Sequence, residues 1–139
     1  MHRIIATSAL ALSVLAGSAA QAMTGDSVAA AFRGEWVPAQ AACTSPLKLV
    51  LEANLVAFVN GSQRVEYRKL EQCFSCAGGH LDQNPPTMLS TEAMGDSPFM
   101  IYLDAAKKSR KPAVTVDFSN DKKLGARFPL GTAALKKCS

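Results

Sequence analysis

From Leu47 onward the chain consists of short apolar runs separated by turn residues, and this pattern constrains the fold more than any other feature. The dipeptide Asn60-Gly61 stands between two such runs and is a strong hairpin signal, because both residue types tolerate positive φ. Apolar and polar residues alternate over residues 114–118, as expected for a strand with one buried face. The expected strands cover residues 47–51, 55–59, 64–74, 88–91, 99–104, 113–118 and 126–130.

Seven or eight short strands with little helix predict an all-β domain, either a small antiparallel up-and-down barrel or a sandwich. Asp26 is a suitable N-cap for a short helix over residues 27–32, which Gly34 would end. We expect one β-barrel-like domain over residues 23–139.

The first 22 residues have the composition of an export signal. Arg3 precedes an uncharged run rich in Ala, Leu and Ser, and Ala20-Gln21-Ala22 fits a signal peptidase site. No second apolar run is long enough to span a bilayer. We therefore expect residues 1–22 to be removed, leaving a periplasmic or secreted protein without a transmembrane segment.

Four cysteines follow the expected cleavage site, and an even number in an exported chain predicts two disulfides: Cys43, Cys73, Cys76 and Cys138. If residues 64–76 are extended, Cys73 and Cys76 lie about 10 Å apart and face opposite ways. That geometry favours two long-range bonds, from this pair to Cys43 and Cys138. The alternative is a bond between Cys43 and Cys138 with a local bond between Cys73 and Cys76.

The stretch Cys73-Phe74-Ser75-Cys76 has the spacing of a thiol-disulfide motif, and His80 adds a possible zinc ligand. Gly78-Gly79 oppose the helix that would activate a thiolate, and an oxidising compartment favours disulfides over zinc. We expect a structural bond here and no cofactor or metal. The alternative function is a thiol-disulfide redox or metal-binding protein that uses Cys73, Cys76 and His80.

Catalytic signals are weak in the mature sequence. It has one histidine, His80, and no G-x-S-x-G motif. Glu92 and Asp96 lie in an expected loop, where acidic residues are common. We therefore expect a protein that is not an enzyme.

A cluster of four cations lies in the connection before residue 113: Lys107, Lys108, Arg110 and Lys111. Such a cluster could contact an anion, an acidic protein partner or the phosphates of an envelope component. The net charge of the whole chain, +4, is too small to indicate a nucleic-acid binder. We expect a monomer with a possible protein or envelope partner.

Gly34-Glu35-Trp36 follows the expected helix and precedes the run of hairpins. This arrangement resembles the G-x-W motif of lipocalin-like (calycin) barrels, and the resemblance implies that Trp36 plugs one end of a barrel. Bacterial periplasmic inhibitors of secreted metalloproteases share this plan, with a cysteine soon after the motif that here would be Cys43. Their reactive N-terminal segment is extended, whereas residues 23–32 are expected to be partly helical. The resemblance implies a non-catalytic binding or inhibitory module of the bacterial periplasm with an unknown ligand or partner.

Overall fold

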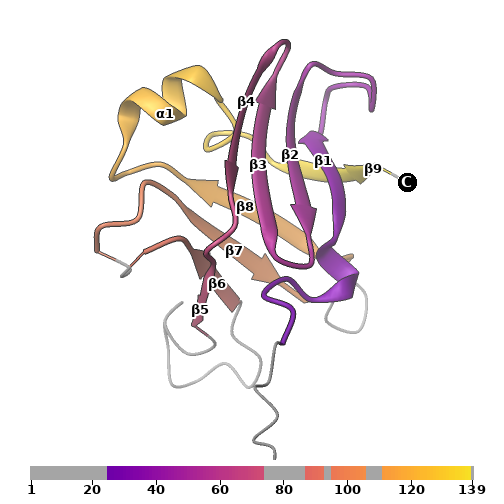
Figure 1. Ribbon diagram of the computed structural model, residues 1–139. Coiled ribbons are helices and arrows are strands. Elements are labelled where there is room, and N and C mark those ends of the chain that lie inside the picture. Colours follow the sequence, from indigo (N-terminus) through magenta and orange to yellow (C-terminus); the bar gives the residue numbers. More distant parts are fainter. Residues whose placement is uncertain (1–24, 74–86, 93–94, 106–110, 139) are drawn as a thin grey trace, which may run out of the picture.

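The computed structural model describes residues 25–73, 87–92, 95–105 and 111–138. In these residues two antiparallel sheets lie against each other, and a short helix covers one end (Figure 1). The predicted all-β fold is confirmed. The arrangement is sandwich-like, and the described residues do not form the closed barrel that was the other expectation.

The first sheet has the strand order β4-β3-β2-β1-β9 and the second has the order β5-β6-β7-β8. The first sheet consists of β1 (Gly34–Pro38), β2 (Leu47–Glu52), β3 (Leu55–Asn60), β4 (Gln63–Tyr67) and β9 (Leu135–Cys138). The second consists of β5 (Glu71–Cys73), β6 (Thr87–Ser90), β7 (Met100–Asp104) and β8 (Ala113–Asp117). A single 3-10 turn, η1 (Ala30–Phe32), precedes β1, and helix α1 (Lys122–Arg127) follows β8.

Neighbouring strands in each sheet follow one another in the sequence, except that β9 returns to pair with β1. The strand order is therefore that of an up-and-down meander whose last strand comes back to its first. Among the described residues, no ladder joins β4 to β5 or β8 to β9, although β8 lies beside β9. These two breaks divide the meander into two sheets, and we call the second break the β8–β9 seam.

The expected hairpin at Asn60-Gly61 is formed by β3 and β4. Asn60 pairs with Gln63, so the loop itself is Gly61-Ser62. Gly61 has a φ of 60°, whereas no non-glycine residue of the described chain has positive φ. A glycine at the first loop position fits a type II′ turn, so the turn needs one residue with positive φ rather than the two expected.

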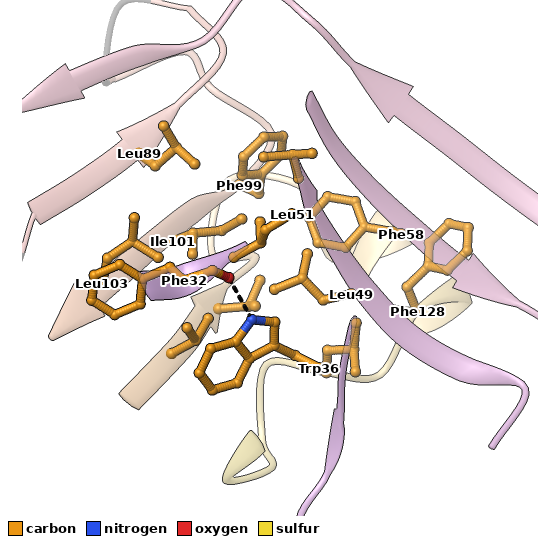
Figure 2. Packing of buried hydrophobic residues seen from close by; sticks show 14 of the residues in the cluster. Phe32, Trp36, Leu49, Leu51, Phe58, Leu89, Phe99, Ile101, Leu103 and Phe128 are labelled. Carbon is orange, nitrogen blue, oxygen red and sulfur yellow. Dashed lines mark hydrogen bonds between the residues drawn. The ribbon is translucent and has the colours of Figure 1, made fainter. Parts of the chain in front are cut away.

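The space between the sheets is filled by a continuous apolar core that contains Trp36, Phe58 and Phe99 (Figure 2). The Phe58 ring lies near its centre, with ring centroids 5.1 Å from those of Phe99 and Phe118 and 6.0 Å from that of Phe128. Such tilted and edge-on contacts between aromatic rings are favourable. The core therefore depends on aromatic packing across the two sheets.

Several expected elements are wrong in position or type. Residues 126–130, expected as a strand, contain the end of α1, because the Asp121 carboxylate caps that helix by accepting from the Leu124 N–H at 2.9 Å. The expected strand over residues 64–74 divides into β4 and β5, which belong to different sheets. The helix expected over residues 27–32 is reduced to η1, and Asp26 instead forms an ion pair with Arg33 at 2.5 Å.

Candidate functional site: a cationic pocket at the β8–β9 seam

A pocket of about 470 Å³ lies beside the β8–β9 seam. One wall is the whole of β9, and the other is Lys111-Pro112, the segment that leads into β8. The side chain of Trp36, on the neighbouring strand β1, contributes to the lining although it is almost fully buried. The pocket thus combines residues from the first strand, the last strand and the segment before β8.

The position of Trp36 is determined by a buried hydrogen bond. Its indole Nε1–H donates to the carbonyl oxygen of Phe32 at 2.8 Å, as Figure 2 shows. Phe32 is the last residue of η1, so the short turn before β1 orients the ring in β1. Since both groups are buried and paired, the indole is held in one orientation, and Trp36 borders the pocket with very little exposed surface.

Strand β9 is held in place by pairing with β1 and by a disulfide. Cys138 lies opposite Glu35 in the ladder, and its sulfur is bonded to that of Cys43, with Cα atoms 5.7 Å apart. Cys43 lies in the loop between β1 and β2. The bond therefore ties the last strand of the first sheet to the loop that follows the first strand.

The side chain of Lys137 crosses the surface at Gly34 to reach η1. Its Nζ donates to the carbonyl oxygen of Ala31 at 3.0 Å. A Cβ atom at position 34 would lie 3.1 Å from Cε of Lys137, and Gly34 also has a φ of 126°. Glycine in the Gly34-Glu35-Trp36 motif thus provides both a backbone conformation and space for this lysine.

The pocket is positively charged. Lys111, Lys136 and Lys137 line it and are exposed, and the lining contains no acidic residue. None of the ion pairs formed between described residues involves these three lysines. An anion entering the pocket would therefore meet cations that are not already neutralised by a carboxylate.

A second hollow, of about 310 Å³, lies between the end of β8 and α1. A Cβ atom at Gly125 would lie 2.9 Å from Cβ of Phe118, and one at Gly131 would lie 3.1 Å from the same ring. These glycines let the chain pack closely against Phe118. The lining of this hollow contains one cation, Lys122, and one anion, Asp117, whereas the charged residues that line the seam pocket are all cations.

The structure brings only part of the expected cationic cluster to this site. Lys111 lines the pocket, whereas Lys107, Lys108 and Arg110 lie outside the described residues. Lys136 and Lys137 were not singled out from the sequence. The signal that could have identified them is a lysine pair directly before Cys138, in a short strand at a sheet edge where lysine is common.

The cysteines follow the alternative pairing at Cys43 and Cys138, so the favoured pairing of these two with Cys73 and Cys76 is wrong. That expectation assumed one extended strand through residues 64–76, but β5 belongs to the second sheet while β9 returns beside β1. Cys73 is also disulfide-bonded, and the described chain contains no free cysteine.

Two further residues of the redox and metal hypothesis, Cys76 and His80, lie outside the described part of the chain. Within that part, no group of three or more His, Cys, Asp or Glu side chains could hold a metal ion. Glu92 and Asp96 are described and are exposed on the connection between β6 and β7.

Comparison of the chain with models of known protein families, with curated proteins and with solved structures finds no match. In the described ranges, no helix has the length and apolar character needed to cross a bilayer.

Proposed function

We propose that the protein is a non-catalytic binding or inhibitory module that is exported to the bacterial periplasm or secreted after removal of residues 1–22. The observation that carries this proposal is the cationic pocket at the β8–β9 seam, where Pro112 and Leu135 provide apolar surface. Apolar walls with a few polar groups at fixed positions are typical of ligand sites. A partner that is acidic at the point of contact would fit this pocket best.

The resemblance of Gly34-Glu35-Trp36 to the lipocalin-like motif supports an inhibitory role. Within each sheet, strands that follow one another in the sequence are neighbours, and β9 returns to β1; this order supports the meander that the resemblance implies, although the meander is broken into two sheets. The inhibitors that share this plan act on secreted metalloproteases. We therefore take a secreted zinc metalloprotease as the first partner to test.

The test uses purified protein of residues 23–139 and a secreted zinc metalloprotease, with residual activity measured against inhibitor concentration. We expect inhibition at near-equal molar amounts and a complex on size-exclusion chromatography. The double variant Lys111→Glu, Lys136→Glu should inhibit more weakly, because it reverses two charges at the pocket. The matched control is Lys122→Glu, Lys123→Glu, which makes the same charge change on α1.

Two results would contradict the proposal. Equal inhibition by the pocket variant and the α1 variant would show that the pocket is not the inhibitory site. If the protein neither inhibits the protease nor forms a complex with it, the inhibitory role is wrong.

The redox alternative has a separate test. Because Cys73 and the Cys43–Cys138 pair are disulfide-bonded, protein purified from the periplasm should show no reactive thiol and should not catalyse reduction of insulin by dithiothreitol. Two readily alkylated thiols and insulin reductase activity would favour the thiol-disulfide function instead.

A further inference from the structure

The edge of β9 that faces away from β1 pairs with no other strand of the described residues, and it presents backbone hydrogen-bonding groups at the pocket. The Ala39 N–H donates to the Ala134 carbonyl at 2.7 Å, in register with the β1–β9 ladder. Hydrogen-bonded and non-hydrogen-bonded pairs alternate in an antiparallel ladder. The backbone N–H and C=O groups of Lys136 and Cys138 therefore point toward β1, and those of Leu135 and Lys137 point away from it.

These outward groups are not used by β8. No ladder joins β8 to β9 among the described residues, and Leu135 and Lys137 both line the pocket. A strand edge with unpaired groups can accept an extended peptide as an added strand. The pocket is thus a place where main-chain pairing and side-chain burial can occur together.

The geometry of the seam limits how far such a peptide can extend. The pocket lies where Lys111-Pro112 borders β9, and past that point β8 itself lies beside β9. The chain segment after α1 also approaches β8, since a Cβ atom at Gly131 would lie 3.2 Å from the carbonyl oxygen of Val116. An added strand would therefore have to end within the pocket.

The charge of the pocket selects which end of a peptide it accepts. A peptide N-terminus carries an ammonium group, which Lys111 and Lys136 would repel, whereas a C-terminus carries a carboxylate that both can attract. The Nζ of Lys137 already donates to the Ala31 carbonyl, so we assign the carboxylate to Lys111 and Lys136, while the backbone groups of Lys137 point away from β1. Beside the cations, the half-buried Pro112 and Leu135 offer an apolar surface to a side chain.

We propose that the seam pocket binds the free C-terminus of an extended peptide whose last residue is apolar. The terminal carboxylate contacts Lys111 and Lys136, the peptide backbone pairs with Lys137 on the outer edge of β9, and the last side chain packs against Pro112 and Leu135, close to Trp36. This inference rests on the proposed binding function and specifies the chemistry that the pocket recognises.

The test uses the emission of Trp36, the single tryptophan of the chain, as a reporter within the pocket. Protein of residues 23–139 is titrated with an N-acetylated hexapeptide that ends in leucine with a free carboxylate, and with the same peptide amidated at its C-terminus. We expect saturable emission changes with both. Amidation should weaken affinity by about tenfold or more, because it removes a charge-assisted contact.

Charge variants locate the carboxylate. Lys111→Glu and Lys136→Glu should each weaken binding of the free-acid peptide by about tenfold and leave binding of the amide little changed. Lys123→Glu, at an exposed lysine on α1 that does not line the pocket, is the matched control and should change affinity less than about twofold. Unchanged far-UV circular dichroism should accompany all three substitutions.

Dodecanoate is titrated as a third ligand. Three outcomes would overturn the inference: equal binding of acid and amide, loss of affinity as large in Lys123→Glu as in the pocket variants, or no binding of the free-acid peptide, with or without binding of dodecanoate. Binding of dodecanoate without the peptide would identify the pocket as a site for alkyl carboxylates.

The proposed function is tested independently of this inference. If the protein inhibits a metalloprotease in a manner that depends on Lys136 but does not bind the peptide, the proposed function stands and only the inference of a peptide ligand is wrong.

Discussion

Trp36 connects the core of the molecule to its candidate site through one side chain. Its ring is 1% exposed and belongs to the apolar cluster between the sheets, yet it also lines the seam pocket. The hydrogen bond to Phe32 gives the indole a polar role as well as an apolar one, because phenylalanine, the apolar aromatic residue nearest to it, has no donor for that carbonyl. A residue of this kind contributes to stability and to the shape of a binding surface at the same time.

We expect Trp36→Phe to reduce the free energy of unfolding by about 2–4 kcal/mol, since it leaves the Phe32 carbonyl without its donor and removes part of a buried ring. Urea denaturation followed by far-UV circular dichroism measures the change. Tyr102→Phe, at a half-buried position on β7, is the control and should cost less than about 1 kcal/mol. Similar losses in both variants would show that the Phe32 hydrogen bond contributes little.

At the scale of single elements, the β3–β4 hairpin depends on Gly61. Its φ of 60° lies in the left-handed region, which costs a residue with a Cβ atom about 1–2 kcal/mol. We expect Gly61→Ala to lower the free energy of unfolding by about that amount, as measured by thermal or urea denaturation. The space around position 61 is open, so the loss would come from backbone conformation rather than from a clash.

Gly95→Ala provides the comparison, because that glycine is also in open space but does not have positive φ. Alanine there should be neutral or stabilise by up to about 1 kcal/mol, through the lower entropy of the unfolded chain. If the two substitutions had the same effect, strain at Gly61 would not be the cause.

Elements with alternating apolar residues could be predicted from the sequence, and those formed through tertiary contacts could not. Strands β2, β3, β7 and β8 lie close to their expected positions, because their apolar residues face the core. In contrast, β9 reads Leu-Lys-Lys-Cys and has few apolar residues to signal a strand. It is extended because it pairs with β1 and is bonded to Cys43.

The candidate site could be predicted only in part for the same reason. Lys111 stood out as the last member of a cationic cluster, whereas Lys136 becomes its neighbour only when β9 returns to the first sheet. The pairing of β9 with β1 is a long-range contact, and no local sequence pattern predicts it. Asp121, by comparison, is a local N-cap signal for α1 that the expected strand over residues 126–130 did not take into account.

At the scale of the whole molecule, the Cys43–Cys138 bond closes a segment of 95 residues that contains nearly the entire fold. In the chain-entropy model, a loop of roughly 100 residues gives up to about 4.7 kcal/mol by restricting the unfolded state. We expect Cys43→Ser and Cys138→Ser each to lower the free energy of unfolding by about 2–5 kcal/mol, measured by urea denaturation under non-reducing conditions. The double variant should resemble either single variant, because all three lack the same bond.

A melting temperature within about a degree of that of the unmodified protein, in either single variant, would contradict a stabilising bond. Loss of β9 pairing has a separate readout. In the double variant, amide exchange should accelerate at Glu35 and Val37 on β1 more than in β3, which is paired on both sides.

The return of β9 to β1 also determines the order in which the molecule can be completed during synthesis. Strand β1 is made early and gains one neighbour from β2, but its other edge has no partner until residues 135–138 emerge about a hundred residues later. For that interval β1 offers an open edge that other chains could pair with. The first sheet is thus completed last. A nascent chain interrupted anywhere before β9 exposes the unpaired edge of β1, which can pair with strands of other chains.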